Sequence, residues 1–185
     1  MSATPVLLTS GDPSGVGPEI ALKAWEAGER FVWVGDPRHL PDGCKWRELA
    51  DLAEVRQSGA MPILRHDFAA PAKPGQPDPA NARGVIEVIE RAVALVQSGM
   101  AGAICTAPIH KKALKDGAAF AFPGHTEFLA HLAGVDRVVM MLACRELRVV
   151  PATIHIALSE VPAALTEELL EDTIRITHAS LMRDF

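Results

Sequence analysis

The sequence has few cysteines and no excess of basic residues. These two features argue against disulfide-rich, zinc-finger and nucleic-acid-binding proteins. Its three cysteines, Cys44, Cys105 and Cys144, are widely spaced and form no Cys-x-x-Cys pair. We therefore expect neither a disulfide framework nor a zinc finger, but three buried thiols in a reducing compartment. Eighteen Lys and Arg residues stand against 23 Asp and Glu residues, for a net charge of −5. This balance argues against a partnership with nucleic acid.

The sequence also lacks a long hydrophobic run. Residues 1–8 show no basic segment followed by an apolar stretch, and no segment approaches the roughly 20 apolar residues of a membrane span. We therefore expect a cytoplasmic protein without membrane contact. With 185 residues, of which 49% are hydrophobic, the chain can bury a core without covalent staples.

Short apolar runs alternate with helical patterns along the chain. Helices are predicted at 19–27, at 85–96 and from Thr166 onward, and a Pro-rich exposed loop at 69–80. Strands are predicted at 5–9, 31–34, 61–64, 102–106, 138–142 and 147–156. This alternation predicts an α/β fold with a mostly parallel sheet, and the adjacent strands in 138–156 make it partly mixed. The last helix ends at Phe185 without a stop signal where a strand should follow, so we expect a truncated chain.

A glycine-rich loop, SGDPSGVGPEI at 10–20, lies between the first predicted strand and helix. Free amides at such a junction can bind an anion, and glycines can equally serve close packing. Two nucleotide-binding motifs fail here. A P-loop needs Lys and Ser or Thr after its last glycine, and the dinucleotide fingerprint needs a glycine where Ile20 stands.

Two further segments carry polar side chains. TAPIHK at 106–111 follows a predicted strand, so His110 and Lys111 either hold an anionic ligand at the sheet edge or form a solvated helix start. In GHTEF at 124–128, His125 and Thr126 either orient a polar substrate or cap a helix. His155 lies in a predicted apolar strand, where a histidine is a core residue or, with other ligands, a metal ligand.

Taken in order, these segments resemble the 4-hydroxythreonine-4-phosphate dehydrogenase family of pyridoxal phosphate biosynthesis. The resemblance rests on SGDPSGVGPEI, TAPIHK, GHTEFLA and the apolar segment with His155 followed by Ser159-Glu160-Val161-Pro162. It implies a fold similar to isocitrate and isopropylmalate dehydrogenases, an α/β/α sandwich in a two-domain homodimer. It also implies NAD-dependent oxidation and decarboxylation of 4-phosphooxy-L-threonine, a phosphorylated small molecule, with NADP as the alternative cofactor.

The resemblance assigns roles to individual residues. His125 and Thr126 would bind substrate, His110 and Lys111 are weaker candidates at the cleft, and His155 would be one of three histidines on a divalent metal (Zn, Mg or Co). The other two histidines, and most of the cofactor site, belong to a C-terminal half that residues 1–185 do not contain. We therefore expect residues 1–185 to be the N-terminal part of a two-domain dehydrogenase, inactive alone. A dehydrogenase of phosphothreonate or phosphoerythronate, and a non-catalytic fragment, stay open as alternatives.

Overall fold

The computed structural model describes residues 4–55 and 59–185 and divides the chain into two compact units, one up to Ala133 and one from Gly134. The first unit is a five-stranded parallel sheet with strand order β3-β4-β2-β1-β5. Its strands are β1 (Val6–Thr9), β2 (Val32–Gly35), β3 (Trp46–Glu48), β4 (Met61–Arg65) and β5 (Ala103–Thr106). Its helices are α1 (Gly17–Glu26), α2 (Ala82–Gln97), α3 (Lys111–Ala118) and α4 (His125–Ala133). Three 3-10 turns complete it: η1 (Pro37–His39), η2 (Leu52–Glu54) and η3 (Pro79–Asn81).

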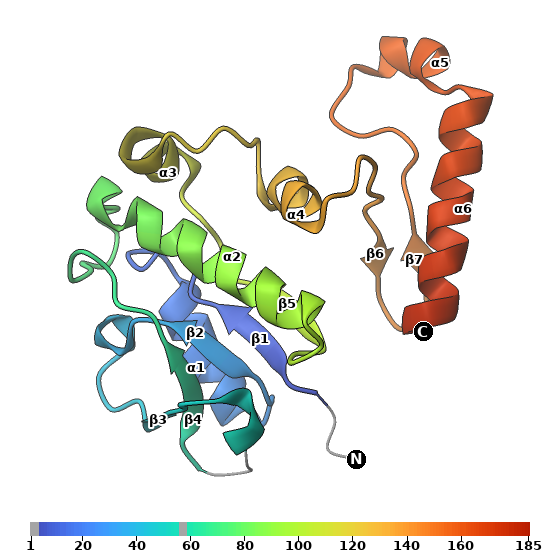
Figure 1. Cartoon of the computed structure of the whole chain (residues 1–185). Helices are drawn as coiled ribbons and strands as arrows, with labels where there is room; N and C mark the ends of the chain where they lie inside the picture. Colours follow the sequence, from blue (N-terminus) through green and yellow to red (C-terminus); the bar gives the residue numbers. More distant parts are fainter. Residues whose placement is uncertain (1–3, 56–58) are drawn as a thin grey trace. The chain divides into compact units, whose positions relative to one another are not determined.

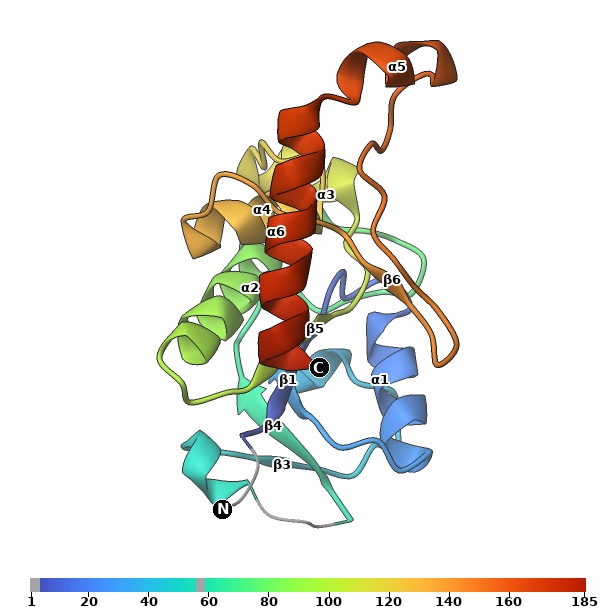
Figure 2. The same cartoon turned by 90° about the vertical axis from the view of Figure 1, so that its right-hand side faces the viewer.

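The sheet is covered by helices on both faces because successive strand residues point to opposite sides. Leu7 joins a core with α2, and its neighbour Leu8 joins a second core with Ala21 and Trp25 of α1. Figures 1 and 2 show α1 and α2 on opposite sides of the sheet. The α/β architecture with a parallel central sheet is thus confirmed. Parallel sheets buried on both faces carry continuous apolar runs, and this explains why VLLT and FVWV identified their strands.

The second unit contains a short antiparallel pair and a long helix. β6 (Leu142–Ala143) pairs with β7 (Arg148–Val149) in a sheet of its own, so this pair does not extend the parallel sheet. η4 (Leu158–Glu160), α5 (Val161–Ala164) and α6 (Glu167–Asp184) follow. Thr166 accepts a hydrogen bond from the Leu169 amide at 3.1 Å and caps α6, as the sequence predicted.

The long strands predicted at 138–142 and 147–156 are wrong in extent. The paired strands that the structure has there are two residues each, Leu142–Ala143 and Arg148–Val149, so only Leu142 of the first prediction and Arg148 and Val149 of the second are paired. Pro151 lacks the amide that a ladder needs, and His155 has a φ of +60°, in the left-handed region, so the chain turns away from a strand.

The thiols also differ from expectation. Cys44 is half-buried, whereas Cys105 and Cys144 are exposed. Cys105 lies on β5, which ends the sheet, and Cys144 directly follows the two-residue strand β6, so neither segment buries its side chain. All three are free. Within the described residues, no helix combines the length and apolar character needed to cross a membrane.

Candidate functional site

The carboxyl ends of β1 and β5 form the point where the sheet's connections diverge. The loop after β1 leads to α1 on one face, and the loop after β5 leads to α3, whose Leu114 belongs to the core on the other face. β1 and β5 are neighbours in register, with Thr9 opposite Thr106. In open parallel sheets, ligands bind at such a divergence. Both the glycine-rich loop and TAPIHK start here.

The glycines of the first loop serve close packing. Gly11 has a φ of +66°, and a Cβ there would lie 2.4 Å from the Pro108 carbonyl oxygen. A Cβ on Gly17 would lie 2.3 Å from the Ser10 carbonyl oxygen. The two loops are joined directly, because the Asp12 amide donates to the Pro108 oxygen at 2.9 Å. Only glycine allows the backbones to approach this closely.

Four amides of the same loop, those of Ser10, Asp12, Ser14 and Gly15, are already bonded. The Ser14 amide donates to Asp12 Oδ1 at 3.0 Å and the Gly15 amide to the Asp12 carbonyl at 3.0 Å. The Ser10 amide donates to Val34. A loop whose amides bind its own carboxylate does not form a cradle for a phosphate or a dinucleotide. Of the two interpretations of this loop, the structure favours packing.

His110 caps a helix and lines a small cavity. Its Nδ1 accepts a hydrogen bond from the Ala113 amide at 3.1 Å, at the start of α3. Its ring also borders a cavity of about 10 Å³ together with Asp12 and Asn81, room for about one water molecule. The Nδ1 bond leaves Nε2 as the protonated nitrogen of the neutral ring.

Asn81 is a polar residue of this cavity that sequence reasoning missed. Its side chain is only 2% exposed and its Oδ1 accepts from the Ala70 amide at 2.9 Å. Its Nδ2 is buried without a hydrogen-bond partner in the described part of the chain. The only local signal was its place in an Asp-Pro-Ala-Asn run before a helix, where Asp78 caps η3 through the Ala80 amide.

His125 begins α4 and leaves one ring nitrogen free. The ring is half-buried, and its Nε2 is buried with no partner among residues 4–55 and 59–185. Burial, followed by the nearby charge of Lys111, lowers the pKa of His125. Thr126 is exposed beside it. His125 is therefore neutral near pH 7 and can exchange a hydrogen bond with a ligand.

Lys111 and Glu127 approach the same turn. A Cβ on Gly124 would lie 3.7 Å from Lys111 Nζ and 3.6 Å from Glu127 Oε2. Lys111 is exposed at the start of α3, next to His110. The structure thus brings His110, Lys111, His125 and Thr126 into one region built from two adjoining helix starts. An imidazole, an ammonium and a hydroxyl there suit a polar, anionic ligand.

A packed aromatic cluster fixes this helix start in place. Phe128 is buried on α4, with its ring centroid 5.1 Å from those of both Phe120 and Phe122. Phe120 and Phe122 follow α3, so the cluster joins α4 to the segment that carries Lys111. Rings at these distances pack favourably in edge-on and tilted arrangements.

His155 is the remaining candidate of the sequence analysis. It belongs to the second unit and is exposed. In the described ranges, no set of three or more His, Cys, Asp or Glu side chains is spaced to hold a metal ion. A catalytic metal needs at least three protein ligands. The described residues of this chain do not fit a metal centre by themselves.

Comparison with known proteins shows which family this chain matches. The family model described as "Pyridoxal phosphate biosynthetic protein PdxA" matches residues 27–185. A curated 4-hydroxythreonine-4-phosphate dehydrogenase from Paracoccus denitrificans is 62% identical over 99% of this chain and 58% of its own length. The chain thus spans under two thirds of the curated relatives that it matches.

Solved structures give the same result for the fold. A 4-hydroxythreonine-4-phosphate dehydrogenase from Burkholderia phymatum superposes with a TM-score of 0.87 at 35% identity, over 98% of this chain and 59% of that one. One from Klebsiella pneumoniae superposes with a TM-score of 0.89 at 29% identity, over 98% of this chain and 60% of that one.

Proposed function

Since the chain belongs to the PdxA family of pyridoxal phosphate biosynthetic proteins, we propose that it is the N-terminal part of a two-domain, NAD-dependent dehydrogenase. Its reaction would be the oxidation, with decarboxylation, of 4-phosphooxy-L-threonine. One observation carries the proposal. The turn before His125 adjoins Lys111 of the segment that follows β5, and His125 Nε2 is buried there with no partner within the described residues.

In this proposal, His125 and Thr126 hold the substrate. Because its pKa is lowered, His125 is neutral and offers Nε2 as donor or acceptor to a substrate hydroxyl or amine. Thr126 adds an exposed hydroxyl one residue on. Lys111 adds a positive charge that attracts a phosphorylated, carboxylated molecule. His110, which already caps α3, is a weaker contributor.

In this proposal, most residues that bind the cofactor and the metal lie in the part of the longer relatives that this chain does not match. NAD, or NADP as the alternative, supplies hydride transfer when it is bound, and four amides of the glycine-rich loop described here are already bonded to other groups of the protein. His155 would be one ligand of a divalent Zn, Mg or Co ion and cannot hold it alone. We therefore expect residues 1–185 to be inactive by themselves. From the family resemblance, we also propose that the full-length protein is a homodimer. The free thiols are consistent with a cytoplasmic protein.

The test uses a chimera in which residues 1–185 replace the matching part of the Paracoccus denitrificans relative. We expect this chimera to reduce NAD in the presence of 4-phosphooxy-L-threonine. His125→Asn and Thr126→Val should each lower kcat/KM by about 10- to 100-fold, the loss of a hydrogen bond to a charged ligand. Asp42→Asn, at an exposed position before β3, is the control and should leave kcat/KM unchanged.

A panel of phosphorylated substrates separates the alternatives. Faster turnover of phosphothreonate or phosphoerythronate would favour the sugar-acid dehydrogenase, for which the motifs described here serve equally well. A chimera that folds but turns over none of these substrates would refute the proposed function and favour a non-catalytic fragment.

A further inference from the structure

The small cavity beside His110 is lined by polar groups from three separate segments. Asp12 comes from the glycine-rich loop, Asp78 and Asn81 flank and end the η3 turn, and His110 precedes α3. The cavity measures about 10 Å³, which is room for about one water molecule. Cavities lined only by apolar groups stay dry, whereas a polar cavity of this size suits an ordered water with two to four polar partners.

Asn81 supplies a hydrogen-bond donor to this cavity. Its side chain is 2% exposed, and its Oδ1 is occupied because it accepts from the Ala70 amide at 2.9 Å. Its Nδ2 is buried and has no partner among residues 4–55 and 59–185. A buried donor without an acceptor is costly, so Nδ2 calls for an acceptor inside the cavity.

Two carboxylates supply acceptors at the same place. Asp12 is 9% exposed and accepts from the Ser14 amide through Oδ1 at 3.0 Å. Asp78 accepts from the Ala80 amide through Oδ1 at 2.9 Å. A carboxylate can accept about four hydrogen bonds, so both groups keep capacity for another donor. The lining therefore offers one N–H donor and two acceptors to whatever occupies the cavity.

We propose that the cavity binds one resident water molecule, which accepts from Asn81 Nδ2 and donates to the carboxylates of Asp12 and Asp78. Water is the small molecule that accepts and donates at once, and three hydrogen bonds are typical of a buried water. An anion would be repelled by the two carboxylates. A divalent cation needs about six or more oxygen ligands and would face the N–H of Asn81.

This water would fasten the Pro-rich loop to the glycine-rich loop, independently of the proposed reaction. The two loops already touch, because the Gly75 amide donates to the Ser14 carbonyl at 2.8 Å. Asp78 and Asn81 stand where the Pro-rich loop ends, and Asp12 stands in the glycine-rich loop, so a water between them adds a second attachment. The Gly75 amide is therefore a reporter of how firmly the loops are joined.

A crystal structure of the 185-residue chain, at a resolution that shows ordered water, tests the site directly. We expect one water about 2.7–3.2 Å from Asn81 Nδ2 and from a carboxylate oxygen of both Asp12 and Asp78. A dry cavity would overturn the proposal. So would an ion, which its shorter contacts of about 2.0–2.6 Å to oxygen would identify.

Hydrogen exchange of the Gly75 amide tests the attachment in solution. Asn81→Asp keeps an oxygen for the Ala70 amide but replaces the donor by a third carboxylate, so the water loses its bond at this residue. We expect the protection of Gly75 at neutral pH to fall at least about tenfold relative to that of Ile89, a fully buried residue of α2 that reports on global unfolding.

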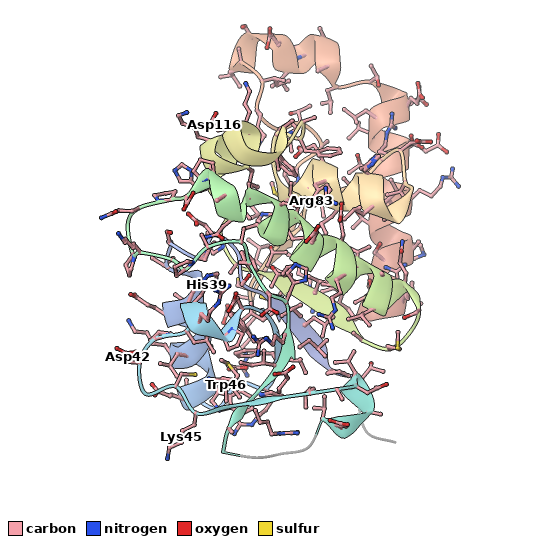
Figure 3. The ribbon with its side chains drawn as sticks, turned by 60° about the vertical axis from the view of Figure 1, so that its left-hand side comes forward. His39, Asp42, Lys45, Trp46, Arg83 and Asp116 are labelled. Carbon is pink, nitrogen blue, oxygen red and sulfur yellow. The ribbon has the colours of Figure 1, made fainter. Side chains whose placement is uncertain are left out.

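The control for this measurement is Asp116→Asn. Asp116, labelled on α3 in Figure 3, pairs with Lys112 and does not line the cavity, so Gly75 should keep its protection. Equal protection of Gly75 in Asn81→Asp and in the wild type would contradict the attachment. An equal fall at Gly75 and Ile89 would also contradict it, because Asn81 would then act only on the stability of the whole unit.

Discussion

Replacing Gly11 with alanine should strongly destabilise the first unit, because the two loops at the proposed site meet at this residue. Gly11 has a φ of +66°, and its alanine Cβ would lie 2.4 Å from the Pro108 carbonyl oxygen and 2.9 Å from the Ala107 carbonyl carbon. All of these atoms belong to backbone, so no side chain can rotate away. The loops after β1 and β5 would have to separate.

Three costs contribute to the expected loss. An alanine in the left-handed region costs about 1–2 kcal/mol. Forcing the backbones apart costs about 1–3 kcal/mol, as for overpacked sites. Separation also breaks the bond from the Asp12 amide to Pro108, worth about 1 kcal/mol. The free energy of unfolding should therefore fall by about 4 kcal/mol, a large share of the roughly 5–15 kcal/mol typical of a domain.

Gly99→Ala is the matched control, because its φ is +76° and no atom lies within 4 Å of the added Cβ. It should cost only the conformational part, about 1–2 kcal/mol. Denaturant unfolding followed by tryptophan fluorescence measures both, since Trp25, Trp33 and Trp46 all lie in the first unit. If Gly11→Ala were no more destabilising than Gly99→Ala, the close approach of the two loops would be refuted.

Two further outcomes concern charge. Asp36→Asn should cost about 3 kcal/mol at neutral pH, because the buried carboxylate accepts from the Arg38 guanidinium and the Phe68 amide. Burial alone would raise the pKa of Asp36, but these bonds lower it well below its usual range. The difference from wild type should thus be full above about pH 4 and shrink as the pH falls through the lowered value, whereas exposed Asp67→Asn stays within about 0.5 kcal/mol. Lys111→Met should raise the pKa of His125 in an NMR titration, and Lys112→Met, whose lysine pairs with Asp116, should not; equal shifts would remove Lys111 as a cause.

The sequence predicted those elements that carry a continuous apolar run or a clear helical period. β1, β2 and β5 follow continuous apolar runs, and α2 follows a helical period of buried residues. β3 was missed because Trp-Arg-Glu, at the opposite edge of the sheet, contains no apolar run. The strands around 142–149 were overextended because apolar runs suggest a strand even where no neighbouring strand pairs with them.

The site was predictable only in part, because a local sequence pattern does not show which distant segments contact one another. Pattern placed His110 and His125 at helix starts, where the structure has them. It could not show that Asn81 is buried, because that depends on a bond to Ala70 in a loop without secondary structure. Nor could spacing decide between an anion cradle and close packing for the glycine-rich loop, a choice that rests on where the Asp12 and Ser14 groups point.

The position of β1 within the sheet has a consequence for how the chain folds. β1 is made first, and it pairs with β2 early, but its other neighbour is β5, at residues 103–106. On the ribosome, one side of β1 must therefore wait until the intervening chain has emerged. Such long-range parallel pairing slows folding and prolongs the exposure of apolar strands. We expect refolding to be limited by the pairing of β1 with β5.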